Sequence, residues 1–139
     1  MFRDCLKTVK IPRHIVEAIY AQAAQEAPIE ACGYLAGKAD SVSKHYPMTN
    51  IDQSAEHFSL DPTEQFAVIK RVRAEGLEIL GVYHSHPETP ARPSQEDIRL
   101  AYDPTISYVI ASLAENQYTI KSFRIADGNV LQEALEVIA

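Results

Sequence analysis

The sequence predicts an α/β (α+β) fold in which a mixed β-sheet is flanked by helices. Short apolar runs suited to buried strands alternate with segments of helical periodicity, and Gly and Pro residues separate them. Hydrophobic residues make up 46% of the chain and charged residues 23%, which is the balance of a globular protein. The length of 139 residues matches one ordinary domain, and no repeat or linker divides the chain. We therefore expect a single domain over residues 1–139.

The first part of the chain is expected to form a helix, a hairpin and a loop. Residues 11–27 carry apolar side chains four positions apart and a proline suited to a first helical turn. Residues 31–37 are a short apolar run bounded by glycine, as in a buried strand, and residues 41–49 are its expected partner. The polar residues 50–60 predict a loop.

A second helix is expected from Asp61 onward. Asp61 is a good N-cap and Pro62 suits the first helical position, while Gly76 is expected to end the helix. Its buried face is expected to carry Phe66, Ile69 and Val72. The apolar residues 77–83 then predict a buried strand.

The remaining segments continue this alternation. Three prolines make residues 84–93 irregular, and residues 94–102 have the pattern of a helix start. Residues 106–113 predict another buried strand, and residues 118–125 alternate as a half-buried strand does. A hairpin turn at Asp127-Gly128 leads to a last strand from Asn129. These patterns do not determine the order of the strands.

Charge and cysteine content exclude several classes of protein. The 13 Lys and Arg residues against 19 Asp and Glu give a net charge of −6, which argues against a nucleic-acid partner. Cys5 and Cys32 form no C-x-x-C pair and do not indicate a secreted disulfide scaffold. The charged N-terminus lacks the apolar run of a signal peptide, and no stretch is long enough for a membrane span. We expect a cytoplasmic protein without a membrane partner, of unknown oligomeric state.

A metal site is indicated directly after the apolar residues 77–83. In His84-Ser85-His86-Pro87, the two histidines are two positions apart and point to the same side of an extended chain, with Leu80 and Val82 expected to continue that face into the core. Asp97 follows a proline-stiffened loop and falls in the first turn of a helix, where the helix dipole favours an ionised carboxylate. We expect one zinc ion, held by these three side chains and carrying a bound water at its fourth position.

Each piece of this pattern also has a simpler explanation. An isolated H-x-H pair usually binds nothing, and Ser94 with Asp97 is what a helix N-terminus favours, a Ser cap with an acidic residue three positions later. The metal site is favoured because both pieces occur at this spacing after a buried strand. His14, His45 and His57 lack a partner at ligand spacing and are assigned to the surface or to polar packing, and Cys32 to packing as a small hydrophobe.

With these residues, the sequence resembles the JAMM/MPN+ metalloproteases, and in particular their compact prokaryotic-type members. The family signature is an upstream Glu, then H-[ST]-H-P, seven residues, a Ser, and an Asp three positions beyond it. Residues 87–93 number seven, Ser94 follows, and Asp97 closes the pattern; residues 30–37, EACGYLAG, resemble the stretch around the family's catalytic Glu. The likeness extends over nearly the whole chain and implies the JAMM/MPN sandwich, which is related to cytidine deaminases.

The resemblance also implies catalytic roles. Glu30 would take a proton from the zinc-bound water and deliver it to the leaving amine, although composition alone would make it a solvated loop residue. Ser94 would donate a hydrogen bond to the developing oxyanion, a role compatible with capping a helix.

The family resemblance further implies a substrate. Members hydrolyse a peptide or isopeptide bond after the C-terminal tail of a ubiquitin-like protein, and the compact members are linked to sulfur-carrier proteins with a Gly-Gly tail. Such a tail is expected to add along a sheet edge that leads to the zinc, near the loop of residues 50–60. The group on the leaving side is not readable from the sequence.

Two other functions stay open. A non-catalytic MPN-type scaffold shares the fold but lacks the ligands, which are all present here. A RadC-like DNA-associated module shares the H-x-H-P and P-S-x-x-D stretches, but the acidic charge and Glu30 disfavour it. A zinc deaminase is set aside because its H-x-E and P-C-x-x-C motifs are absent.

Overall fold

The computed structural model describes residues 8–139. Cys5 and the N-terminal residues considered for a signal peptide lie outside this range. The described elements are, in chain order, β1 (Val9–Pro12), α1 (Arg13–Glu26), β2 (Cys32–Lys38), β3 (Ser41–Met48), α2 (Pro62–Ala74), β4 (Glu78–His86), α3 (Gln95–Arg99), β5 (Ser107–Ser112), the 3-10 helix η1 (Ala114–Asn116), β6 (Thr119–Ala126), β7 (Asn129–Glu133) and β8 (Leu135–Ile138). The strands form one mixed sheet in the order β7-β6-β5-β4-β2-β3-β1-β8.

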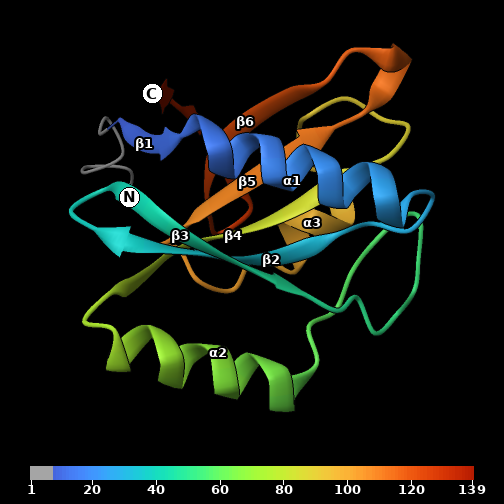
Figure 1. Cartoon of the computed structure of the whole chain (residues 1–139). Helices are drawn as coiled ribbons and strands as arrows, with labels where there is room; N and C mark the ends of the chain where they lie inside the picture. The colour runs from blue at the N-terminus through green and yellow to red at the C-terminus, as the bar shows by residue number, and fades with distance from the viewer. Residues whose placement is uncertain (1–7) are drawn as a thin grey trace.

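Two helices cover opposite faces of the sheet (Figure 1). α1 buries Ile15, Val16 and Ile19 against one face, and α2 buries Val68 and Val72 against the other. Because β2 is covered on both faces, its residues are buried almost without interruption, which explains its continuous apolar sequence. The predicted α/β (α+β) class, a mixed sheet flanked by helices, is confirmed.

β4 lies near the middle of the sheet. It runs antiparallel to β2 on one side and parallel to β5 on the other. The connection between the parallel strands β4 and β5 contains α3. The C-terminal end of β4 therefore faces the loops that follow the strand, the position at which open α/β sheets commonly bind ligands.

A β-bulge in β4 changes which side chains share a face. Leu35 pairs with Gly81 and Ala36 pairs with Ile79, so Leu80 is an extra residue without a partner in β2. Leu80 consequently packs with the α1 side of the core, whereas Val82 packs with the α2 side. The expectation that Leu80 shares the histidine face was wrong, because the bulge reverses the alternation before Val82.

Several element boundaries also differ from the expectations. α1 begins at Arg13 rather than at residue 11, because residues 9–12 form the strand β1 beside β8 and Pro12 is the N-cap of the helix. α3 ends at Arg99 rather than at residue 102. The segment expected as one strand from Asn129 forms two strands, β7 and β8, separated by Ala134.

The buried face of α2 was predicted incorrectly at one position. Phe66 is 66% exposed and lies on the outside of the helix, where the Lys70 ammonium is 5.8 Å from its ring centre. The buried residues of the helix are Val68 and Val72. They are four positions apart, so they lie on the same face of the helix, which packs against the sheet. The helix start was predicted correctly, since the Asp61 side chain accepts a hydrogen bond from the Thr63 backbone N–H.

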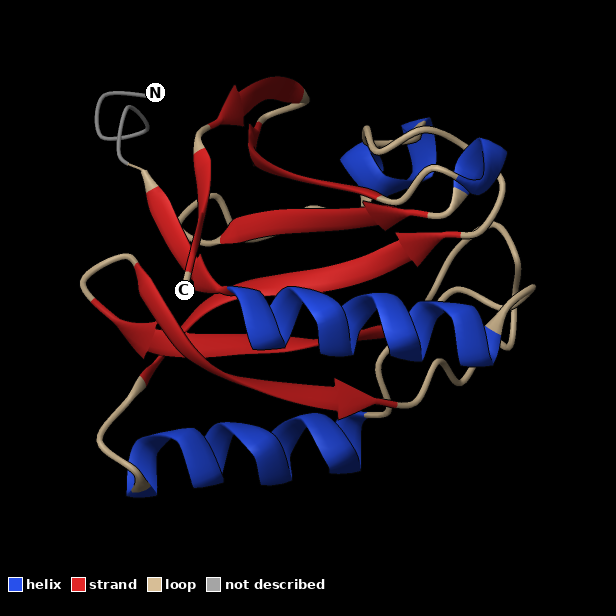
Figure 2. Ribbon diagram, turned by 45° about the horizontal axis from the view of Figure 1, so that its top comes forward, coloured by secondary structure: helices blue, strands red, loops and turns tan. Residues whose placement is uncertain are grey.

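The two outer strands of the sheet are close neighbours in sequence. β7 and β8 stand at opposite ends of the strand order, yet only Ala134 separates them in the chain. The Ala134 carbonyl accepts a hydrogen bond of 3.0 Å from the Val9 N–H, and β8 then runs parallel to the whole of β1. The sheet thus curls toward closure, with β1 and the C-terminal strand side by side near the start of α1 (Figure 2).

Candidate metal centre

The C-terminal end of β4 presents two buried imidazoles. His84 and His86 alternate onto the α2 face of the sheet, and His84 stands opposite Cys32 of β2. The backbone around them is held on both sides, because the Ser85 N–H donates to the Ala31 carbonyl and the Leu113 N–H donates to the His86 carbonyl. Central strands on both flanks therefore give these two rings a rigid support.

Asp97 completes a triangle of ligand atoms with the two histidines. Its Oδ2 lies 3.1 Å from His84 Nε2 and 3.0 Å from His86 Nε2, and the two Nε2 atoms are 3.1 Å apart. Ligands about 2.0–2.1 Å from a tetrahedral zinc are about 3.3–3.4 Å from one another, so this triangle is close to one face of such a site. Within residues 8–139, these three side chains are the set identified as able to hold a metal ion.

The hydrogen bond of His86 assigns its ring proton. Its Nδ1 is 2.9 Å from the Pro90 carbonyl oxygen, which can only accept, so Nδ1 carries a proton, and in the neutral ring Nε2 offers its lone pair to the triangle. Ligating histidines are commonly oriented in this way by a carbonyl or carboxylate. The donor set therefore fits a divalent cation, because a shared cation satisfies Nε2 and Oδ2 lone pairs that converge on one point.

Asp97 is fixed by the start of α3. The Ser94 N–H donates to Asp97 Oδ2 at 2.9 Å, and the Asp97 N–H donates to Ser94 Oγ at 3.0 Å, which together form a capping box. Burial alone would raise the pKa of the Asp97 carboxyl, but the hydrogen bonds with His84 and His86 outweigh burial and hold that pKa well below its usual range. Asp97 is thus an ionised ligand candidate.

The pKa values of the two imidazoles shift in opposite directions. Burial lowers the pKa of His84 despite the neighbouring Asp97, which favours the neutral ring that a metal requires. Burial also opposes the charged form of His86, but Asp97 and the Pro90 carbonyl raise its pKa overall. Metal and proton therefore compete for the His86 ring.

Glu30 lies two residues before the start of β2 and is buried with an exposed fraction of 2%. Continuing the antiparallel pairing of Cys32 with His84 places residue 30 opposite His86. Its Oε1 has no hydrogen-bond partner among the described residues. Burial raises the pKa of the Glu30 carboxyl to about 8, while the nearby His86 acts to lower it. Composition alone suggested a solvated loop residue, and the structure shows this to be wrong.

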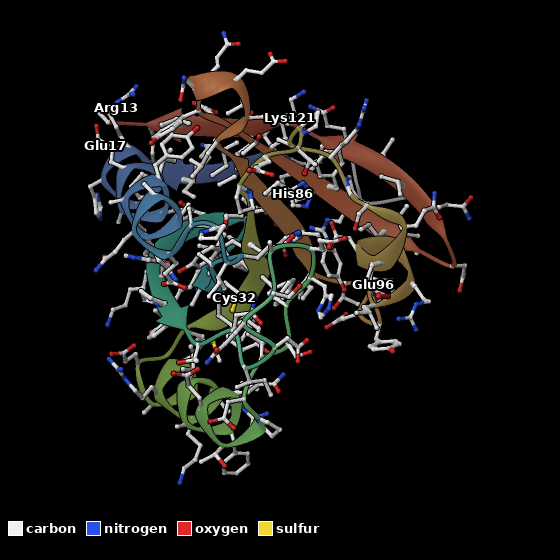
Figure 3. The ribbon with its side chains drawn as sticks, turned by 90° about the vertical axis from the view of Figure 1, so that its right-hand side faces the viewer. Arg13, Glu17, Cys32, His86, Glu96 and Lys121 are labelled. Carbon is white, nitrogen blue, oxygen red and sulfur yellow. The ribbon has the colours of Figure 1, made fainter. Side chains whose placement is uncertain are left out.

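The Ser94 hydroxyl lies beside the same centre. Its oxygen accepts the hydrogen bond from the Asp97 N–H, so the hydroxyl proton is still available as a donor. Capping the helix and donating a hydrogen bond to another group are therefore compatible in a single state. All five predicted site residues, Glu30, His84, His86, Ser94 and Asp97, thus lie at one end of β4, which Figure 3 views directly with His86 and Glu96 labelled.

A cavity of about 360 Å³ opens next to the triangle. Residues of the loop 50–60, α3 and the sheet line it, and His84 and Asp97 form part of its wall. Phe58 of this loop stacks on the His84 ring, with ring centres 4.8 Å apart and planes inclined by 27°. The cavity therefore gives a ligand direct access to the metal-binding side chains.

The sequence analysis did not identify several residues that build the site. Phe58 packs on a ligand, the Pro90 carbonyl orients another, and the Ser85 hydroxyl accepts a hydrogen bond of 2.7 Å from the Ala31 N–H. Phe58 and Ser85 have no spacing signal, because each depends on a contact with a distant segment, whereas Pro90 is four residues from His86 and acts through its backbone carbonyl, which side-chain patterns do not show. His57 also lines the cavity, with its Nδ1 3.0 Å from Asp52 Oδ2.

Cys32 shares the face of His84 but packs as expected from its size. It is fully buried in the cluster that includes Tyr34, Met48 and Val82. Burial raises the pKa of its thiol to about 12, which keeps the sulfur protonated and uncharged. Cys32 is not part of the metal-binding set described above.

Comparisons with known proteins identify relatives of this architecture. The family described as prokaryotic homologs of the JAB domain matches residues 12–126. A "CysO-cysteine peptidase" of Mycobacterium tuberculosis is 37% identical over 127 residues, which are 89% of this chain and 87% of that protein. A "Desampylase" of Haloferax volcanii is 33% identical over 109 residues, which are 73% of this chain and 78% of that protein.

A solved structure extends this similarity over the fold. A protein from Desulfitobacterium hafniense, known from a solution structure, is 44% identical and superposes with a TM-score of 0.85 over 95% of this chain and 93% of the other. The resemblance predicted from the H-S-H-P, Ser94 and Asp97 pattern is therefore confirmed at the level of the family. The chain, with its mixed sheet and its converging His, His and Asp side chains, belongs to the prokaryotic homologs of the JAB domain.

Proposed function

We propose that this protein is a zinc-dependent peptidase or isopeptidase that cleaves the bond after the C-terminal tail of a ubiquitin-like or sulfur-carrier protein. One observation carries the proposal: three ligand atoms converge within 3.0–3.1 Å of one another beside a buried carboxylate, Glu30, whose Oε1 has no partner among the described residues. Its relatives include proteins named as a CysO-cysteine peptidase and a desampylase, and the chain is a hydrolase of their family.

His84, His86 and Asp97 would hold the metal. One zinc ion at this position would leave a fourth vertex for water and lower the pKa of that water to about 7. Asp97 stays ionised through its contacts with both histidines, and Pro90 keeps the His86 lone pair directed at the site. The capping box fixes the carboxylate before any ligand binds.

Glu30 would transfer the proton, and Ser94 would stabilise the negative charge that develops on the scissile carbonyl oxygen. A carboxyl whose pKa lies near neutrality can accept a proton from the attacking water and then donate it to the leaving amine. The Ser94 hydroxyl can donate a hydrogen bond to the oxyanion of the scissile carbonyl while its oxygen still accepts from the Asp97 N–H.

We place the Gly-Gly tail of the substrate in the cavity between the loop 50–60 and α3. β4 pairs with β5 as far as His86 and with β2 as far as His84, and the Ser85 N–H donates to the Ala31 carbonyl beyond that pair, so we propose the cavity rather than an edge of β4 as the route of the tail. The cavity reaches His84 and Asp97 directly. A chain of small residues could enter it in an extended form and place its carbonyl at the metal.

The first prediction tests the assignment of ligands and base. We expect Glu30→Ala to keep one zinc per chain and to lose turnover of carrier-tail fusions, whereas Asp97→Ala should lose both zinc and turnover. Zinc content is measured by atomic emission and cleavage by mass spectrometry. Equal cleavage by the two variants and the unaltered protein would refute the catalytic assignment. Stoichiometric zinc without cleavage of any tail fusion would instead indicate a scaffold.

We propose that residues 1–139 act as one catalytic domain, that the protein is cytoplasmic, and that no nucleic acid is its partner. Within residues 8–139, no helix combines the length and apolar character needed to cross a bilayer. Binding of DNA that weakens with rising salt would contradict the last expectation.

A further inference from the structure

Asn50 is a buried polar residue whose side-chain amide is fully used. It lies two residues after the end of β3, and its exposed fraction is 3%. Its Nδ2 donates to the Glu30 carbonyl at 3.1 Å and to the His57 carbonyl at 3.0 Å, with a longer contact of 3.5 Å to the Ser54 carbonyl. Its Oδ1 accepts from the N–H groups of Asp52 and Ser59 at 3.1 and 3.2 Å. Both donors and both acceptor positions of the amide are therefore occupied.

These hydrogen bonds join the loop 50–60 to Glu30, two residues before β2. Glu30 lies outside the regular strand, and both of its backbone polar groups are bound to this loop region. Its N–H donates to the Ser54 carbonyl at 2.9 Å, and its carbonyl accepts from Asn50 Nδ2. The Glu30 Oε1 has no partner among the described residues, so the hydrogen bonds that position this residue act on its backbone.

The same amide also shapes the part of the loop that touches the metal-binding side chains. Asn50 binds the His57 carbonyl and the Ser59 N–H, which flank Phe58 on either side. Phe58 stacks on the His84 ring at 4.8 Å. One side chain therefore fixes the backbone of Glu30 and the aromatic ring that packs on a metal ligand.

We propose that Asn50 is a positioning residue that sets the placement of Glu30 relative to His84, His86 and Asp97. It acts through the Glu30 backbone and through Phe58 and contacts neither substrate nor metal. The inference rests on the proposed function, in which Glu30 transfers the proton. A misplacement of a reacting group by about 1 Å can cost about 100-fold in rate. The Asn50 amide, which fixes the position of the Glu30 carboxylate, therefore has a large effect on turnover.

Asn50→Asp is the sharpest test, because aspartate keeps the size and the acceptor oxygen but removes both N–H donors. We expect kcat on a carrier-tail fusion to fall by about 10- to 100-fold, with KM within about two-fold of the unaltered protein and with one zinc still bound. Asn50→Ser, which retains one donor, is the second variant if Asn50→Asp does not fold. Its kcat should lie between those of Asn50→Asp and the unaltered protein. Ser122→Ala is the matched control, because it removes a buried hydrogen bond to Glu133 at a distant part of the sheet.

A second readout does not depend on activity. In the metal-free protein, amide hydrogen exchange should accelerate at Glu30 in Asn50→Asp, because the Glu30 and Ser54 carbonyls lose the donor that they share. The Ser59 amide, whose acceptor oxygen is retained, and the Ala31 amide, bound to Ser85 Oγ, should keep their protection. An unchanged kcat in an active, zinc-loaded Asn50 variant would overturn the positioning role, as would loss of zinc or equal acceleration of exchange at all three amides. If the unaltered protein itself binds no zinc and cleaves no tail, the proposed function fails, and the exchange pattern still decides whether Asn50 holds Glu30.

Discussion

At the scale of single residues, the chemistry of the site follows from burial. Glu30 and Asp97 are both carboxylates at one end of β4, yet their pKa values move in opposite directions. Burial raises that of Glu30 to about 8, whereas hydrogen bonds with two histidines overcome burial at Asp97 and lower it. Such a separation is what the proposed roles require, with proton transfer by Glu30 and ligation by Asp97.

The raised pKa of Glu30 predicts how stability depends on pH in the metal-free protein. The folded pKa of about 8 lies above the ordinary value of 4.5, so the folded state holds the proton between these values. The resulting stability is complete below pH 4.5 and is lost as the pH rises toward 8, by up to about 1.4 kcal/mol per pH unit. Glu30→Gln should remove this contribution. Urea unfolding of chelator-treated protein at several pH values measures it.

The control for this prediction is Glu17→Gln, a change of an exposed residue on α1. Its pH dependence should match that of the unaltered protein. Other groups titrate in the same window, so the comparison is the difference between variants at each pH. Parallel stability curves for Glu30→Gln and the unaltered protein would show that the carboxyl does not retain its proton on folding.

Ser94 supports a prediction that separates its two roles. Loss of a helix cap costs about 1 kcal/mol of stability, whereas loss of an oxyanion donor costs about 3–4 kcal/mol in the barrier, or about 100- to 1,000-fold in kcat. Ser94→Ala should show both effects. Asp61→Ala removes the comparable cap of α2 away from the site, and it should lower stability alone. A kcat for Ser94→Ala as high as that for Asp61→Ala would leave Ser94 with capping only.

At the scale of elements, the geometry of the site depends on close strand packing around β2. A Cβ added at Gly33 would lie 2.4 Å from the Tyr46 carbonyl oxygen and 2.5 Å from the Tyr83 hydroxyl. The Tyr46 carbonyl belongs to the neighbouring strand and cannot withdraw without breaking the pairing with β3. Gly33 therefore permits the close approach of β2 to its neighbours.

Gly33→Ala should destabilise the protein by about 1–3 kcal/mol or more, because overpacking forces the strands apart. Gly128→Ala is the comparison: its φ of +79° disfavours alanine, but nothing lies within 4 Å of the added Cβ. That change should cost about 1 kcal/mol. Chemical denaturation measures both. Equal costs for the two variants would show that contact at Gly33 is not the limiting factor.

The elements also show what local patterns can and cannot predict. The Asp61 cap, the turn at Asp127-Gly128 and the strand 107–112 follow from residues close together in sequence, and the structure confirms them. The bulge at Leu80 was missed, since it depends on the pairing with β2. Phe66 was placed on the wrong face because apolar character does not show where a helix meets the sheet.

At the scale of the whole molecule, the sequence predicted the fold class and the clustering of the site residues, but not the strand order. His84 and His86 lie on the same side of one strand because they are two positions apart, and a short connection brings Asp97 beside them. The spacing of these residues in the sequence therefore predicted that they cluster. The contacts of Asn50 with the Glu30 backbone and of Phe58 with His84 join segments that are distant in the chain, so the spacing of residues in the sequence did not predict them.

The pairing of β1 with β8 has a consequence for how the protein is made. The ribosome adds every residue of the metal centre while β8, one of the two strands that pair with β1, is still untranslated. Until Leu135–Ile138 are synthesised, the edge of β1 that pairs with β8 has unpaired backbone donors and acceptors, with which another polypeptide can pair. Chains that end before residue 135 should therefore be more sensitive to proteases than chains that extend through residue 139.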